Sequence, residues 1–192
     1  MGVITSVAKA ASTYAPVHSY TSESIYHAVN NGAKGIEHGN MLDHPRQKRW
    51  PKKSVFLTPM LVTFAIDADS PGSSMLSPPK QEKDRNTLTT DLETFKITKD
   101  ENFKICFGTE LLDPVGIFQS REFAIRAQVQ APLEIIQSAN ITSTSMMGLR
   151  DVRQIKESFW ANLLVLKWNP LEDITVLAGG HVTAPTLVFK GC

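Results

Sequence analysis

Apolar and polar positions along the first forty residues predict two short strands on either side of a helix. Residues 15–18 form an extended apolar segment ahead of Thr21, which can cap a helix. Apolar side chains then follow helical spacing from Ile25 to Val29, and a second strand is expected at residues 34–39. Strand, helix and strand in so short a segment form a βαβ unit, whose two strands lie parallel and adjacent in one sheet.

The same alternation continues through the middle of the chain and predicts an α/β fold. Alternating strands and helices imply a parallel sheet with helices outside it, either doubly wound or barrel-like. Further strands are expected at residues 54–58 and 103–107, and further helices around residues 88–95, 123–127 and 132–139.

Two segments interrupt this rhythm. Residues 67–86 are rich in Ser, Pro, Asp and Lys and predict a long mobile loop, either an active-site lid or surface filler. Residues 44–53 carry five basic residues and no acidic one. That run fits a solvated face, with nuclear import or anion binding as the alternatives.

The last part of the chain changes character and predicts a small β region. Apolar runs at residues 163–166 and 186–189 are expected to form two strands separated by a turn. We therefore divide the chain into an α/β part, residues 1–158, and a C-terminal β segment, residues 159–192.

Composition and charge exclude several classes of function. Twenty Lys and Arg against 19 Asp and Glu give a formal net charge of +1, which argues against a nucleic-acid partner. No apolar run approaches the length of a membrane span, and no secretory signal is recognisable, so we expect a cytoplasmic protein without a membrane partner. The two cysteines, Cys106 and Cys192, suggest neither a disulfide framework nor a zinc finger.

Three polar residues fall at the carboxyl ends of predicted strands, where parallel α/β folds collect their ligands. These residues are His18, His38 and Glu110. Two imidazoles and a carboxylate are suitable ligands for zinc or a similar divalent ion, and a bound ion would activate a water molecule. The alternative is that each histidine is a hydrogen-bonded structural residue, and these residues alone do not decide between the two. Cys106 lies inside a strand and is expected to be a buried structural thiol.

Five segments, taken together, resemble the metal-dependent amidohydrolase superfamily, in particular its imidazolonepropionase-like and prolidase-like branch. They follow the family order from the fifth strand unit to the C-terminal β segment, and the resemblance as a whole covers about residues 8–190. The five are residues 18–21, 28–43, 56–62, 107–112 and 169–176.

This resemblance implies a (β/α)8 barrel flanked by a small β-sandwich, of which this chain would hold about the last four strand-helix units and a C-terminal β segment. His18 and His38 match the family's histidine metal ligands on strands five and six. Glu110 falls where the family has an aspartate that binds metal and acts as general acid and base. Tyr20 and Asn40 lie beside the ligands and are expected to contact substrate. The implied cofactor is a divalent metal ion, with zinc as the expected ion.

The departures from the family pattern make the implied metal site incomplete. The first-strand His-x-His pair and the fourth-strand lysine or glutamate have no counterpart in this sequence. Glu110 replaces an aspartate, which moves the carboxylate by about 1.5 Å. Met60 and Asn162 replace a threonine and an aspartate of the family.

Two hypotheses remain open on the sequence. The first is a hydrolase that cleaves amide or peptide-like C–N bonds of a small-molecule substrate with a metal-activated water. The second is a non-catalytic truncated remnant that acts as a binding or accessory protein and has lost the metal. Four parallel strands cannot close a barrel, so we expect a homo-oligomer or pairing with a separate N-terminal half.

Overall fold

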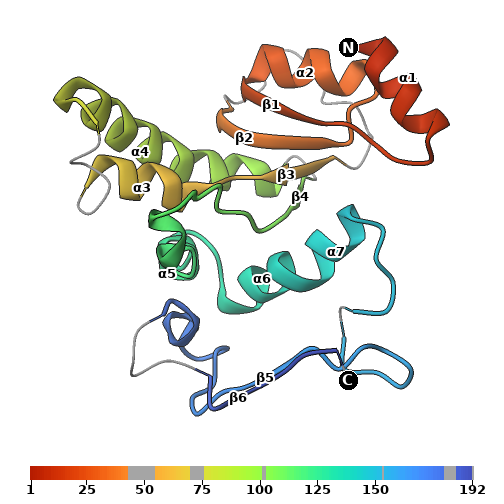
Figure 1. Cartoon of the computed structure of the whole chain (residues 1–192). Coiled ribbons are helices and arrows are strands. Elements are labelled where there is room, and N and C mark those ends of the chain that lie inside the picture. Colours follow the sequence, from red (N-terminus) through yellow and green to blue (C-terminus); the bar gives the residue numbers. More distant parts are fainter. Residues whose placement is uncertain (43–54, 70–75, 101–102, 153, 180–184, 192) are drawn as a thin grey trace.

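A computed structural model describes residues 1–42, 55–69, 76–100, 103–152, 154–179 and 185–191. It contains a four-stranded sheet with helices packed around it and a two-stranded sheet at the opposite end of the molecule (Figure 1). The basic segment at residues 44–53 lies outside the described residues. Within the described part of the chain, no helix is both long and apolar enough to cross a bilayer.

The larger sheet is entirely parallel, in the order β1-β2-β3-β4. Its strands are β1 (Pro16–Thr21), β2 (Gly35–Met41), β3 (Phe56–Thr58) and β4 (Lys104–Ile105). The parallel sheet with its helices confirms the predicted α/β class and is consistent with a partial α/β barrel domain.

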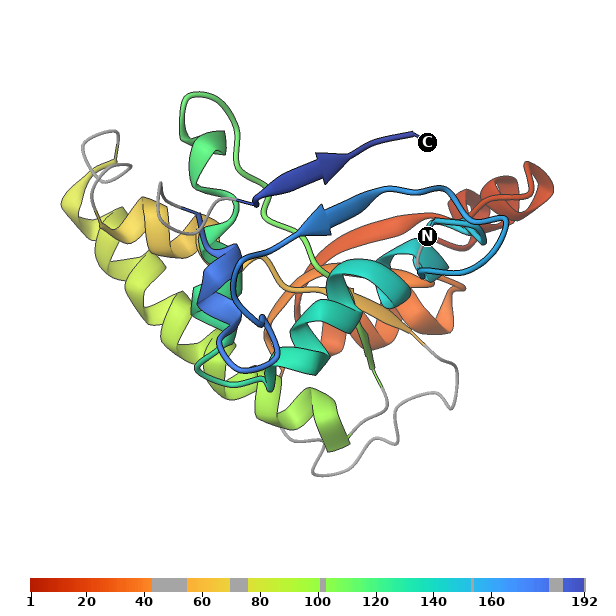
Figure 2. The ribbon, with the colours of Figure 1, turned by 90° about the horizontal axis from the view of Figure 1, so that it is seen from below.

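Helices connect and cover these strands (Figures 1 and 2). The α-helices are α1 (Gly2–Ala10), α2 (Ser22–Asn30), α3 (Leu61–Ala68), α4 (Pro78–Asp100), α5 (Arg121–Arg126), α6 (Pro132–Gln137) and α7 (Ser143–Met146). Shorter turns are the 3-10 helices η2 (Val115–Phe118) and η4 (Ile174–Leu177) and the π-helical segment η3 (Ser138–Thr142).

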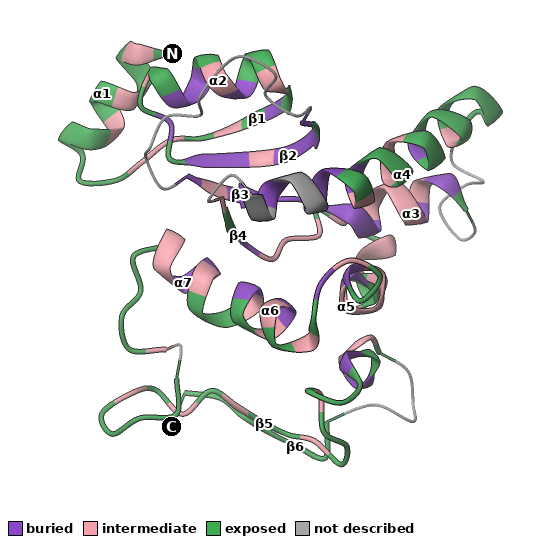
Figure 3. Ribbon diagram, turned by 180° about the vertical axis from the view of Figure 1, so that it is seen from behind, coloured by how far each residue is buried: buried purple, intermediate pink, exposed green. Residues whose placement is uncertain are grey.

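The first βαβ unit forms as predicted. The Thr21 hydroxyl accepts a hydrogen bond from the Ser24 amide, and the Ser24 hydroxyl accepts one from the Thr21 amide, so a reciprocal cap begins α2. The apolar face of α2 packs on the sheet, and Ile25, Ile36 and Leu57 are almost completely buried. Figure 3 shows this core as the buried length of β2 beneath the inner face of α2.

The prediction of a loop over residues 67–86 is wrong in its second half. Helix α4 already begins at Pro78, and proline is tolerated in a first turn because the amides there have no intrahelical acceptor. Lys80 then forms an ion pair one turn along with the buried Asp84, at 2.5 Å. The polar composition that suggested a loop therefore belongs to a largely exposed helix.

The C-terminal segment contains the two predicted strands, β5 (Leu163–Val165) and β6 (Leu187–Phe189), paired antiparallel (Figure 2). They form a sheet separate from the parallel one. Their apolar side chains remain largely exposed, as Leu164 at 54% and Val188 at 65% illustrate. The proposed boundary at residue 158 stays a prediction.

Candidate metal centre

The structure brings the three predicted ligands together at one end of the parallel sheet. His18 lies on β1, His38 on β2, and Glu110 on the segment that follows β4. The His18 Nδ1 and His38 Nε2 atoms are 2.8 Å apart, and His38 Nε2 is 3.5 Å from Glu110 Oε2. One ligand atom from each residue lies within 4.8 Å of the other two. The three side chains are therefore close enough to one another to hold a shared ion.

A distortion of β2 turns His38 toward His18. In the strand register His38 is paired with Ser19, whose hydroxyl bonds to Ser24 on α2 and so faces the helix. Because side chains alternate along a strand, a regular β2 would point His38 toward the helix as well. Instead His38 and Gly39 have φ angles of +75° and +73°, and the pairing shifts at this point. This irregularity re-aims the imidazole toward the opposite face.

Glu110 also depends on an uncommon backbone conformation, with a φ of +50°. It lies five residues beyond the end of β4, so strand geometry does not fix its position. The carbonyl of the preceding residue, Thr109, accepts a hydrogen bond from the Thr63 hydroxyl on α3. The Glu110 side chain remains 39% exposed. Left-handed φ values in non-glycine residues are unfavourable, and they concentrate at functional sites.

Aromatic side chains enclose the His38 ring. Tyr20 stacks on it, with ring centroids 4.6 Å apart and planes 10° from parallel. Phe64 approaches its edge at a centroid separation of 6.4 Å. This burial lowers the pKa of His38 below its usual value, although the Glu110 carboxylate acts in the opposite direction. Partial burial, followed by the charge of Glu110, raises the pKa of Tyr20. The environment therefore favours a neutral imidazole, the form that binds metal.

The second residue expected to contact substrate, Asn40, is placed differently. Its side chain is fully buried and its amide nitrogen donates to the Asp91 carboxylate on α4. The hydroxyl of Thr94, on the same helix, donates to the Asn40 backbone carbonyl. Tyr20 thus borders the three-residue cluster, whereas Asn40 joins β2 to α4.

The donor set fits a divalent ion. Two nitrogen ligands about 2.0–2.1 Å from a tetrahedral zinc lie about 3.3 Å apart, so His18 and His38 would separate by only about 0.5 Å. At 2.8 Å the two nitrogens are within hydrogen-bond distance, which requires one ring to carry a proton there. A metal ion and that proton would therefore compete for the same two lone pairs. The other His38 nitrogen, Nδ1, is buried without a hydrogen-bond partner.

A buried ion pair on α5 holds the backbone at the ends of two strands of the parallel sheet. The sequence alone did not identify it. Glu122 and Arg126 are both fully buried on α5, with Arg126 Nε donating to Glu122 at 2.6 Å. Arg126 also donates to the backbone carbonyls of Pro59 and Cys106, at 2.8 and 2.9 Å. The pair thereby joins the ends of β3 and β4. An i,i+4 Glu–Arg pair in a mixed helix gives no sequence signal that separates a buried position from an exposed one.

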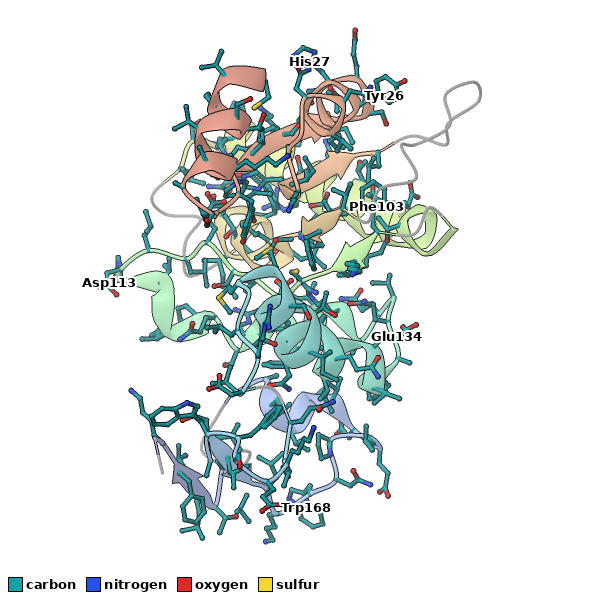
Figure 4. The ribbon with its side chains drawn as sticks, turned by 90° about the vertical axis from the view of Figure 1, so that its right-hand side faces the viewer. Tyr26, His27, Phe103, Asp113, Glu134 and Trp168 are labelled. Atoms are coloured by element: carbon teal, nitrogen blue, oxygen red, sulfur yellow. The ribbon has the colours of Figure 1, made fainter. Side chains whose placement is uncertain are left out.

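Cys106 behaves as the sequence predicts. Cys106 is fully buried, and burial raises the pKa of its thiol to about 11, so it is a structural thiol and not a nucleophile. His27 is exposed and projects from the outer side of α2, away from the cluster (Figure 4).

Comparison with known proteins supports the family resemblance. The chain superposes on the crystal structure of an amidohydrolase with a TM-score of 0.88 and 34% sequence identity, covering 98% of this chain and 46% of that one. A prolidase complexed with N-methylphosphonate-L-proline gives a TM-score of 0.86 and 32% identity, with coverage of 100% and 48%. The resemblance to the metal-dependent amidohydrolase superfamily is confirmed.

A sequence relative and the lengths of the matched proteins complete the comparison. The chain is 23% identical over 180 residues to ochratoxinase from Aspergillus niger, covering 91% of this chain and 37% of that enzyme. No family model matches the chain. The chain therefore spans less than half the length of this curated relative and about half the length of the solved structures.

Proposed function

We propose that this chain is part of a metal-dependent hydrolase that cleaves amide or peptide-like C–N bonds of a small molecule. The observation that carries the proposal is the convergence of His18, His38 and Glu110 within 4.8 Å on a fold shared with amidohydrolases and prolidases. The ion would be divalent, and we propose zinc because two imidazoles and a carboxylate suit it.

Each residue has a proposed role that follows from its position. A bound ion would lower the pKa of a water molecule and polarise a carbonyl group. His18 and His38 would hold the ion through Nδ1 and Nε2, the two atoms that face each other. The partly exposed Glu110 would be a third ligand or carry a proton at Oε2, the oxygen nearest His38.

The positions of Tyr20 and Asn40 support their proposed contacts with substrate to different degrees. The exposed Tyr20 ring shields one face of His38 from water and would line the substrate pocket. Asn40 is a weaker candidate, because its amide is committed to Asp91 away from the surface. Further ligands would come from beyond the described residues, for example from a second copy or from a polypeptide segment that supplies the remaining part of the family fold.

A second function is favoured by the direct contact between the two histidines. With a 2.8 Å contact between His18 and His38, the protein can also be a non-catalytic one that acts as a binding or accessory protein. In that protein the two rings would share a proton and hold no ion.

Metal content separates the two functions. We expect the purified chain to bind about one zinc ion, and His18→Ala and His38→Ala each to weaken binding at least about ten-fold, because each removes one ligand. Elemental analysis and zinc titration calorimetry measure both quantities. His27→Ala is the matched control, since it removes an exposed imidazole from α2 and leaves the cluster intact. An apo parent chain that fails to take up zinc would contradict the hydrolase proposal and favour the non-catalytic protein.

A further inference from the structure

Helix α3 begins shortly after the end of β3 and contacts two parts of the metal centre, the backbone next to Glu110 and the ring of His38. Its residue Thr63 is half-buried and donates its hydroxyl hydrogen to the Thr109 carbonyl, 46 residues along the chain. Its next residue, Phe64, packs edge-on against the His38 ring. One turn of one helix therefore touches the backbone beside Glu110 and the side chain of His38.

The segment that carries Glu110 needs such an external contact. The last strand residue before it is Ile105, and no strand pairing continues to Glu110. Its left-handed φ of +50° is an unfavourable conformation for a glutamate and persists only when surrounding contacts determine it. The Thr63 bond fixes the peptide group that immediately precedes Glu110, and so it fixes the direction in which the carboxylate leaves the backbone.

The start of α3 is itself held firmly. Its own N-cap residue, Met60, makes no side-chain cap, but the Glu122 carboxylate accepts a hydrogen bond from the Val62 amide at 2.7 Å. Arg126 holds Glu122 and also the Pro59 carbonyl just before the helix. Since all these groups are buried, the turn that carries Thr63 is a rigid support for the Glu110 segment.

We propose that Thr63 is a positioning residue for Glu110, which it aligns toward His38 through the Thr109 carbonyl. The inference rests on the proposed metal site and extends it to a residue that reaches the site through a backbone carbonyl. A group that orients a metal ligand from behind has a measurable effect on affinity, commonly a ten- to hundred-fold loss when it is removed.

The test uses isosteric substitutions and zinc titration of the whole chain. Thr63→Val removes the hydroxyl at nearly constant volume and is expected to weaken zinc binding about ten-fold. Thr63→Ser keeps the hydroxyl donor and is expected to bind zinc with the affinity of the parent. Thr144→Val on α7 is the matched control, because that hydroxyl also donates to a backbone carbonyl but lies on another element. Circular dichroism shows whether each variant is folded.

A double substitution separates positioning from a general loss of structure. In a Glu110→Ala background, Thr63→Val should cause no further loss of zinc affinity, because the group that it aligns is gone. Unchanged affinity in the single variant, or an equal ten-fold loss in both backgrounds, would overturn the proposal.

Crystal structures of the metal-free parent and of Thr63→Val give a readout that does not need zinc. We expect the Glu110 backbone to leave the left-handed region in the variant and its carboxylate to move away from His38. If the parent binds no zinc, the proposed function fails, and these structures still decide the role of Thr63. An unmoved Glu110 would contradict that role.

Discussion

The direction of His38 depends on the glycine that follows it. Gly39 has a φ of +73°, a conformation that glycine adopts without steric cost. A Cβ atom at this position would lie 2.6 Å from Cδ1 of Leu57 in the core, closer than carbon atoms can approach. Both the backbone conformation and the missing side chain are therefore required where β2 turns its imidazole toward His18.

We predict that Gly39→Ala both destabilises the folded protein and weakens its binding of zinc. The left-handed backbone costs about 1–2 kcal/mol for a residue with a Cβ, and the clash with Leu57 adds about 1–3 kcal/mol. Gly148→Ala is the matched control, since Gly148 has a φ of +75° and nothing lies within 4 Å of its added Cβ. Urea unfolding measures both variants, and equal losses of unfolding free energy would contradict the packing part of the prediction.

At the scale of elements, β2 and α4 are joined by a buried pair of side chains, Asn40 and Asp91. Burial raises the pKa of the Asp91 carboxyl to about 8, so the folded protein holds it protonated at neutral pH. The Asn40 nitrogen donates to this carboxyl, while the Asn40 oxygen is buried with no donor assigned to it. A protonated Asp91 can supply that donor, which would complete a two-way amide–acid contact.

This pair predicts a specific pH dependence of stability. An unfolded Asp91 loses its proton near its ordinary pKa of 3.8, whereas the folded one keeps it until about pH 8. Between these values the folded state binds more protons, so the free energy of unfolding should fall as the pH rises, by up to about 1.4 kcal/mol per pH unit. Above about pH 8 this contribution should become constant.

Asp91→Asn should remove this slope, because an amide cannot titrate but can still exchange hydrogen bonds with Asn40. The measurement is urea unfolding from pH 5 to pH 8. Glu93→Gln changes an exposed carboxylate on the same helix and should leave the slope as it is in the parent. A variant Asp91→Asn with the slope of the parent would show that another group is responsible.

On the scale of the whole molecule, the described part of the chain leaves two kinds of surface uncovered. The parallel sheet has β1 and β4 at its edges, and the outer edge of each has no pairing partner among the described strands. The β5–β6 sheet exposes a group of large apolar side chains. Its exposed members are Leu164, Val165, Leu187, Val188 and Phe189. Large exposed apolar areas of this kind usually mark an interface.

We therefore predict that the isolated chain associates with itself, or with a polypeptide that supplies the rest of the family fold when one is present. Sedimentation equilibrium should show a mass that rises with concentration, because burying these side chains is favourable. Replacing Leu164 and Val188 with Glu should shift the chain toward the monomer. Ile117→Glu, at an apolar position exposed outside this sheet, is the control. A parent that stays monomeric at about 0.1 mM would contradict the prediction, given ordinary interface affinities.

Much of the architecture and the candidate site could be predicted because the signals are local. The βαβ unit follows from apolar spacing and from the Thr21 cap, both of which lie within a few residues of the structure that they specify. The placement of His18 and His38 on one side of the sheet follows from a general property of parallel sheets, whose strand ends lie on one side, whereas strand geometry does not fix the position of Glu110. Local composition was misleading for the first part of α4, where proline and charged residues form a helix, although the helix expected around residues 88–95 does lie within α4. It gave no signal for α1, whose residues are not buried.

The sequence by itself determined the order of the strands and of most helices, and the chemical identity of the three candidate ligands. Only the tertiary structure decided how those ligands are aimed. The irregularity at His38, the bond from Thr63 to Thr109 and the bond from Val62 to Glu122 join elements that are distant in sequence, the last two across 46 and 60 residues. Periodicity describes one element at a time, whereas the direction of a side chain in this site depends on contacts between several elements.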